Sequence, residues 1–305
     1  MTSQQLSAAH YHVDEKKLAE FAAAIEIPAC PRLIIDMINE QQKESPDINL
    51  IAALAEKDPA IAAALLKTVN SPYFCLRGKI LSVRQATVFL GTRNVINIVT
   101  AIALKNASGD VTGEGPRYFW EMSSTTAAFA AELATRIIGL ARDETYVHVL
   151  FRDAAIPLMI AYRVKSGQIS RDTLTNKNMY MAQVAVEQSS IEHAIIGSHF
   201  TKKWLLPENT QQSVRLHVNV EMVLGENKKT DIPKWVSLQV AIGYLAEHIT
   251  REFLQIEHSA RWLDGHLAAF LKYVDIGEEE FVQITADILA EKNGRLMTGK
   301  LTQKK

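Results

Sequence analysis

The stretch SVRQATVFLGTRNVINIVTAIAL, residues 82–104, decides the fold class of this chain. Ser82 is a strong N-cap, and Gln85, three positions later, can complete a capping box by reaching back to the start of the helix. Gly91 supplies the left-handed exit that ends this first helix. A second helix is expected from Thr92 to Ala107, with an apolar face formed by Val95, Ile96, Val99 and Ile102. No alternating strand pattern competes, so the stretch predicts helices.

The composition of the whole chain agrees with a helical fold. Of 305 residues, 48% are hydrophobic, while only 14 are glycine and 9 are proline. Sandwiches and barrels need many turns, which consume glycine and proline, so this scarcity favours helices over strands. A chain of this length can bury a sizeable core in one large or two modest domains. The prediction is an all-α protein.

Charge and cysteine content narrow the class of protein. The formal net charge of −1 provides no long-range field that would attract a polyphosphate backbone or an anionic membrane. The two cysteines, Cys30 and Cys75, belong to no CxxC motif and to no cysteine and histidine cluster with zinc spacing. The N-terminus has no basic segment leading into an apolar run, and every stretch of eighteen residues contains a charged or strongly polar side chain. We therefore expect a cytoplasmic protein without a membrane segment.

Proline and glycine positions suggest where helices and subdomains end. Asp58 is placed as an N-cap with Pro59 as the first helical residue, and Asn70-Ser71-Pro72 must break that helix. The polar, glycine-rich segment 106–116 is the clearest linker. We predict an N-terminal helical subdomain over 18–107, a C-terminal helical bundle over 117–291 and a flexible basic tail over 292–305. The helices expected in the bundle are Phe119–Ile138, Asp143–Lys165, Met179–Trp204, Asn209–Val218, Pro233–Phe253, His258–Tyr273 and Glu278–Glu291.

Five segments, taken in order, resemble a known family. They are DPAIAAALLKTVNSPYF (58–74), SVRQATVFLGTRNVINIVTAIAL (82–104), FW (119–120), LFRDAAIPLMI (150–160) and IEHAIIGSHFTKKWLLPE (191–208). Their order and spacing are similar to those of the HDOD domain, the HD-related output domain of bacterial signalling proteins. The resemblance covers roughly 18–253. It implies two packed helical bundles, the second similar to a degenerate HD phosphohydrolase core, and a stand-alone regulatory role without an established reaction.

The resemblance also implies where an HD metal site would lie, and the residues there do not suit one. A catalytic site of this class needs imidazole and carboxylate ligands from several helices. Met122 and Arg152 stand where histidines are expected, and the helix from about Trp235 has no carboxylate before Glu247. A thioether suits hard metals poorly, and a guanidinium repels them. We expect no catalytic residues, metal or cofactor, and expect Asp153 to pair with Arg152 or the backbone.

The residues that could form a ligand or partner groove between the bundles come from several motifs. They are Asn70, Ser71, Arg152, Asp153, Glu192, His193 and His217. For Asn70 and Ser71, capping of the preceding helix is the favoured explanation, because turn chemistry alone accounts for these residue types. For the two histidines the alternative is hydrogen-bonded packing within the core.

These observations leave three hypotheses for function. The first is a non-enzymatic signalling module that binds a signalling or regulatory protein, or a small nucleotide-like ligand. The second is a residual HD-type phosphohydrolase acting on nucleotides or cyclic dinucleotides. The third, a helix-turn-helix over 48–69, would need polar side chains facing DNA, but its second helix offers mainly Ala, Ile and Leu, with Lys67 alone. We therefore expect no DNA binding.

Overall fold

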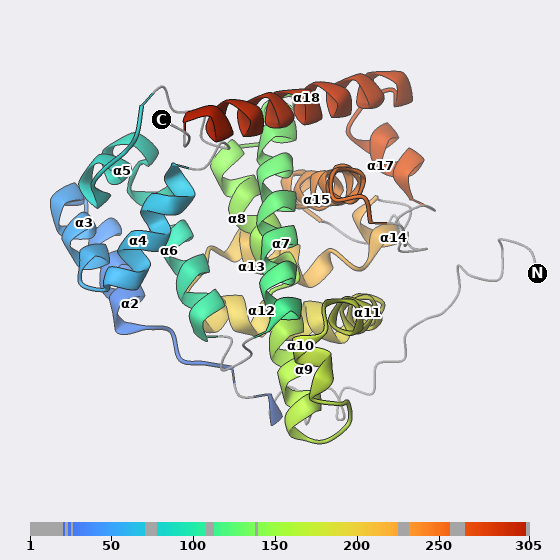
Figure 1. The fold of residues 1–305 in the computed structure, drawn as a ribbon, viewed down its shortest axis with the longest axis horizontal. Coiled ribbons are helices and arrows are strands. Elements are labelled where there is room, and N and C mark those ends of the chain that lie inside the picture. The colour runs from blue at the N-terminus through green and yellow to red at the C-terminus, as the bar shows by residue number, and fades with distance from the viewer. Residues whose placement is uncertain are drawn as a thin grey trace, which may run out of the picture.

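The computed structural model describes residues 21, 24–25, 27–70, 78–107, 113–137, 140–224, 232–256 and 266–302. Within these ranges every regular element is a helix, which confirms the all-α prediction. Two groups of helices pack against each other, as Figure 1 shows. None of the described helices is long and apolar enough to cross a membrane.

The first group is a bundle of short helices in the N-terminal part of the chain. Helices α2, α4 and α5 each pack against α6, and α3 packs against α2 and α5. Asp47 and Asp58 cap α3 and α4 by accepting hydrogen bonds from backbone N–H groups of the first turns. The bundle consists of α2 (Arg32–Gln41), α3 (Ile48–Glu56), α4 (Pro59–Val69), α5 (Val83–Leu90) and α6 (Thr92–Ala107).

The caps predicted around α5 are present. The Ser82 hydroxyl accepts a hydrogen bond from the Gln85 backbone N–H at 3.1 Å, and the Gln85 side chain accepts one from the Leu81 backbone N–H at 2.9 Å. Gly91 ends the helix with φ 79° and ψ 158°. Its positive φ favours glycine, although its ψ lies outside the helical left-handed region. The chain can therefore turn from α5 into α6 at a single residue.

The second group surrounds the long helix α7, which contacts α8, α10, α11 and α15. In Figure 1, α7 runs through the middle of the molecule and α18 lies across one end. The elements are α7 (Glu114–Ala134), α8 (Arg142–Arg152), α9 (Ile156–Lys165), α10 (Asp172–Thr175), α11 (Lys177–Gln188), α12 (Glu192–Lys203), α13 (Glu208–Leu216), α14 (Val220–Val223), α15 (Lys234–Phe253), α17 (Leu267–Tyr273) and α18 (Glu278–Thr302).

Two helices predicted as continuous are each divided in the structure. The expected helix 143–165 breaks between Arg152 and Ile156, because Pro157 has no N–H and its ring would clash with the carbonyl of Asp153 in an unbroken helix. The expected helix 179–204 breaks between Gln188 and Glu192. The first break places Asp153 at the end of α8, where its side chain can reach residues of other helices.

Contacts between the two groups make one continuous hydrophobic core. Helix α6 packs against α8, and the Trp204 Nε1–H donates a hydrogen bond to the carbonyl oxygen of Pro28 at 3.0 Å. The division into subdomains at the linker stays a prediction. Helix α18 continues to Thr302 and so includes most of the segment 292–305, whose flexibility stays a prediction.

Candidate functional site

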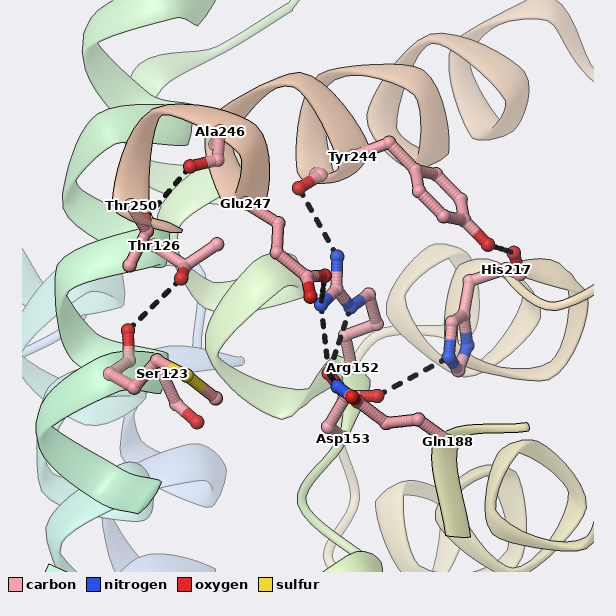
Figure 2. A network of polar contacts seen from close by, with 12 residues as sticks. Ser123, Thr126, Arg152, Asp153, Gln188, His217, Tyr244, Ala246, Glu247 and Thr250 are labelled. Carbon is pink, nitrogen blue, oxygen red and sulfur yellow. Dashed lines mark hydrogen bonds and ion pairs between the residues drawn. The ribbon is translucent and has the colours of Figure 1, made fainter. Parts of the chain in front are cut away.

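The centre of the second bundle contains a buried arginine that binds two carboxylates. Arg152, at the end of α8, is 4% exposed. Its Nε and Nη2 donate hydrogen bonds to Asp153 Oδ2 at 3.1 and 2.8 Å, and its Nη2 also donates to Glu247 of α15. Its Nη1 donates to the carbonyl oxygen of Gly243 at 3.1 Å. Figure 2 shows the guanidinium between the two acidic side chains.

Close packing of α8 on α15 brings these groups together. A Cβ atom at Gly243 would lie at ordinary van der Waals distance from this cluster, 3.5 Å from Arg152 Nη1 and 3.4 Å from a methyl group of Val149. On the far side, Arg251 Nη2 donates to Glu247 Oε1 at 2.8 Å. The two arginines and two carboxylates balance in charge, which is what a buried ionic cluster requires.

The pairing also determines the protonation of the cluster. Burial opposes the charge on Arg152, but the attraction of Asp153 and Glu247 is larger and raises the pKa of the guanidinium above its ordinary value. Burial likewise opposes the ionised form of Asp153. Arg152 and the nearby imidazoles outweigh that burial and hold the pKa of this carboxyl well below its ordinary value. The prediction that Asp153 pairs with Arg152 is confirmed, and Asp153 is a carboxylate.

Two histidines face the other oxygen of Asp153. His193 Nε2, from α12, and His217 Nε2, just after α13, each lie 3.5 Å from Asp153 Oδ1 and 2.9 Å from each other. Their exposed fractions are 1% and 3%. Burial, with the neighbouring His217, lowers the pKa of His193 to about 4, so its ring is neutral at pH 7.

The backbone around His217 fixes the orientation of its ring. Its Nδ1–H donates to the carbonyl oxygen of Val214 at 2.7 Å, so in the neutral ring Nε2 carries the lone pair. The carbonyl oxygen of His217 accepts a hydrogen bond from the Tyr244 hydroxyl at 2.6 Å. Gln188 Nε2 donates to Asp153 Oδ2 at 3.2 Å, so Oδ2 is held by two donors while Oδ1 faces the imidazoles.

These three side chains overturn one premise of the sequence argument. Asp153 does not stand alone, because Asp153, His193 and His217 offer ligand atoms that all lie within 4.8 Å of one another. Each residue was a candidate, but only the meeting of α8, α12 and α13 shows that they converge. The residues of the HD pattern itself still do not fit a metal, because Arg152 binds the carboxylate as an internal cation and Met122 offers a thioether.

Two of the other predicted groove residues, Asn70 and Glu192, lie outside this cluster. Asn70 caps the end of α4, where its Nδ2 donates to Leu66 and Ile80 carbonyl oxygens at 2.9 and 2.7 Å, so the capping explanation is correct. Glu192 is partly exposed and pairs with Arg163 at 3.6 Å. Ser71 lies outside the described residues. The structure thus unites Arg152, Asp153, His193 and His217 and leaves Asn70 and Glu192 outside the cluster.

Two residues in or beside the cluster, Glu247 and His148, were not among the predicted site residues. Glu247 was noted in the sequence only because it comes too late in its helix for the HD pattern. The sequence did offer one sign of its role: Glu247 is the only acidic residue between Val236 and Ile249, in a mostly apolar helix. His148, one turn before Arg152, is fully buried, and neither ring nitrogen has a hydrogen-bond partner. Burial, reinforced by His217 and Arg152, lowers the pKa of His148 to about 3.

Comparison with known proteins now identifies the family. The model of the HDOD domain matches residues 27–220, well over half of the chain. The chain belongs to the HDOD family. A protein of uncharacterized function from Treponema pallidum (strain Nichols) is 26% identical over 210 residues, which cover 67% of this chain and 40% of that protein. The chain therefore spans less than half the length of this relative.

Three solved structures share the fold. An HDOD domain protein of unknown function from Geobacter sulfurreducens has a TM-score of 0.57 at 17% identity and covers 92% of this chain and 98% of its own. A protein from Shewanella amazonensis SB2B is provisionally named a metal-dependent phosphohydrolase. Its structure has a TM-score of 0.59 at 16% identity, and the match covers 91% of this chain and 98% of that one. A protein from Marinobacter aquaeolei VT8 is provisionally named a signal transduction protein. Its structure has a TM-score of 0.60 at 15% identity, and the match covers 95% of this chain and 66% of that one.

Proposed function

We propose that this HDOD protein is a non-catalytic signalling module that works by binding a regulatory protein. The observation that carries the proposal is the position of Arg152, whose guanidinium binds both Asp153 and Glu247 inside the second bundle. An HD phosphohydrolase would use such carboxylates to bind a metal that activates water. In this chain a permanent side-chain cation holds them instead, and it cannot lower the pKa of a water as a metal does.

Two further features favour binding over catalysis. The cluster is buried, with Asp153 and Glu247 8% and 2% exposed, so a substrate has little access to it. The first bundle carries unusually exposed apolar side chains next to or on α5, of which Leu81, Val88 and Phe89 are 76%, 68% and 52% exposed. Exposed apolar side chains grouped on one element are typical of surfaces that bind protein partners. The provisional name of the Marinobacter aquaeolei protein is of the same class.

A residual phosphohydrolase is the second candidate, favoured by one observation. Asp153, His193 and His217 converge as metal ligands do, and a structural relative carries a provisional phosphohydrolase name. Such an enzyme would act on nucleotides or cyclic dinucleotides, and the converging side chains would hold the metal that polarises the phosphate and lowers the pKa of a water.

A turnover assay decides between the two. Purified protein is incubated with nucleoside phosphates and cyclic dinucleotides in the presence of Mn²⁺, Mg²⁺ or Fe²⁺, beside the variant His217→Gln. If the protein is a non-catalytic module, the natural sequence and the His217→Gln variant should show the same turnover. Metal-dependent turnover by the natural sequence that His217→Gln removes contradicts the proposal and establishes the second candidate. Affinity capture from a native bacterial lysate, followed by mass spectrometry, then identifies the partner.

A further inference from the structure

We propose that the outer face of α5 binds an acidic amphipathic helix of the regulatory partner. This surface, the α5 face, consists of Lys79, Leu81, Arg84, Val88 and Phe89. The inference rests on the proposed function and specifies the binding surface and the chemistry of the partner. In Figure 1, α5 lies at the outer edge of the first bundle, away from α7.

The outer side of α5 is unusually apolar for a helix that faces solvent. Its buried residues are Val83, Ala86 and Thr87, which lie on the side toward the bundle. Val88 and Phe89 lie on the other side and are 68% and 52% exposed. A surface helix normally places polar side chains there, because only the side toward the core gains from apolar contacts. The two side chains are therefore available to a partner.

Leu81 extends this apolar surface beyond the start of α5. An apolar residue just before an N-cap often packs on the first turn of its helix, but Leu81 stays 76% exposed. Its backbone N–H donates to Gln85 Oε1 at 2.9 Å. The neighbouring Ile80 exchanges two hydrogen bonds with the Asn70 side chain, at 2.7 and 2.9 Å. A backbone held in this way has less conformational freedom to lose on binding, so Asn70 acts as a positioning residue for Leu81.

Charge complementarity identifies the kind of partner. Residues 59–109 contain six basic residues and no Asp or Glu, although the whole chain has a net charge of −1. Lys79 and Arg84 are exposed, and within the part of the chain that the structure describes neither pairs with a carboxylate. The next cation, Arg93, already pairs with Glu144 at 2.9 Å. Two free cations beside an apolar surface favour a partner whose carboxylates flank apolar side chains.

The size and composition of the α5 face favour a helix over a nucleic acid. The eight residues of α5 are roughly 12 Å long, which matches about two turns of a partner helix. Apolar side chains at spacings of three and four would cover Leu81 and Val88, while carboxylates on either side reach the cations. Nucleic acids gain most of their affinity from many phosphate contacts, and two free cations offer few.

The first test uses a pair of fluorescent peptides with the full-length protein. One is a helical peptide of about 15 residues with leucines at helical spacing flanked by glutamates, and its twin has lysine in place of every glutamate. The protein should bind the acidic peptide about tenfold more tightly, and added salt should weaken this binding. Arg84→Glu should weaken binding of the acidic peptide and strengthen binding of the twin. A loss of structure would not strengthen either.

Val88→Ser and its control Val186→Ser separate the α5 face from exposed apolar side chains in general. Val186, on α11, is 58% exposed, so both variants should keep the circular dichroism of the natural sequence. Only Val88→Ser should weaken binding of the acidic peptide, by about fivefold or more. Equal affinity for the two peptides, or equal effects of the two serine variants, would overturn the inference.

Two further measurements test other occupants of the α5 face. Single-stranded DNA or anionic lipid vesicles that bind more tightly than the acidic peptide, and that Val88→Ser releases, would overturn the inference. A dimer in light scattering that Val88→Ser separates would overturn it as well, because a second copy of the chain would then cover this face.

A crosslinking experiment separates failure of this inference from failure of the proposed function. The photoreactive residue p-benzoylphenylalanine replaces Phe89 or, as a control, Val186, and mass spectrometry identifies the segments crosslinked in a native bacterial lysate. We expect a helical segment rich in Asp and Glu at position 89 only. A captured partner without such a crosslink overturns the inference and leaves the proposed function standing. Metal-dependent turnover beside an acidic crosslink at position 89 would instead overturn the non-catalytic proposal and retain the α5 face.

Discussion

At the residue scale, the most consequential side chain is Arg152. Its removal leaves Asp153 and Glu247 as buried charges without their shared cation. Breaking a buried ion pair in this way costs about 3–5 kcal/mol. We predict that Arg152→Met lowers the free energy of unfolding by that amount, as measured by urea denaturation followed by circular dichroism.

A surface pair provides the control for this prediction. Arg93 binds Glu144 at 2.9 Å, but the two side chains are 62% and 36% exposed. Exposed pairs contribute about 0–1 kcal/mol, so Arg93→Met should change stability by less than about 1 kcal/mol. If the two variants lose equal stability, the buried network does not have the importance assigned to it.

Pairing between neighbours in sequence could be predicted, whereas pairing between helices could not. Arg152 and Asp153 are adjacent, and a buried carboxylate needs a cation, so sequence reasoning reached that pair. Glu247 is 95 positions from Arg152, and its role depends on how α8 packs against α15. The same holds for His193 and His217, whose residue types indicated a site but whose meeting with Asp153 required the packing of three helices.

At the scale of elements, Gly197 controls how closely α12 approaches α13. A Cβ atom at this position would lie 2.9 Å from Val214 Cγ1, closer than packed atoms tolerate. Gly197 is one turn after His193, and Val214 is one turn before His217. The glycine thus allows the two helices to bring their histidines within 2.9 Å of each other.

We predict that Gly197→Val separates these helices. Overpacking of a core typically costs about 1–3 kcal/mol, and the variant should lose this much free energy of unfolding in urea denaturation. Gly277→Val is the control for steric crowding, because a Cβ atom there meets nothing within 4 Å. Equal destabilisation by both changes would mean that close approach at Gly197 is unimportant.

Helix ends were predicted well wherever capping chemistry is local. Asp58, Ser82 and Gln85 act as their sequence spacing indicated. The divisions at 153–155 and 189–191 were missed because both sides of each break continue an apolar pattern. Pro157 provided a local signal for the first break. No comparable residue marks the second, which reflects the packing of α11 and α12 on different neighbours.

At the scale of the whole molecule, ordered motifs predicted the fold better than they predicted its site. The five segments indicated two packed helical bundles because their order and spacing resemble those of the HDOD family. The site depends on the distances between helices, which the segments do not encode separately. Contacts such as Trp204 to Pro28, 176 positions apart, join the first described residues to the second bundle.

The stability of the whole fold should depend on pH through His148. Its pKa is about 3 in the folded protein and about 6.5 in an unfolded chain. Between these values only the unfolded state binds the proton. This histidine therefore contributes stability that is fully present above about pH 6.5 and is lost as the pH falls toward 3. Each such proton changes the unfolding free energy by about 1.4 kcal/mol per pH unit.

We predict that His148→Leu lowers the slope of the unfolding free energy against pH, between about pH 6 and pH 4, by the contribution of one proton. Leucine does not titrate, and it also removes two buried ring nitrogens that lack hydrogen-bond partners. Urea unfolding at a series of pH values, with a chelator present to exclude metal binding, measures the slope. His199→Leu should keep the slope of the natural sequence, because its ring is exposed. An unchanged slope in His148→Leu would show that the ring is protonated, or reached by water, in the folded protein.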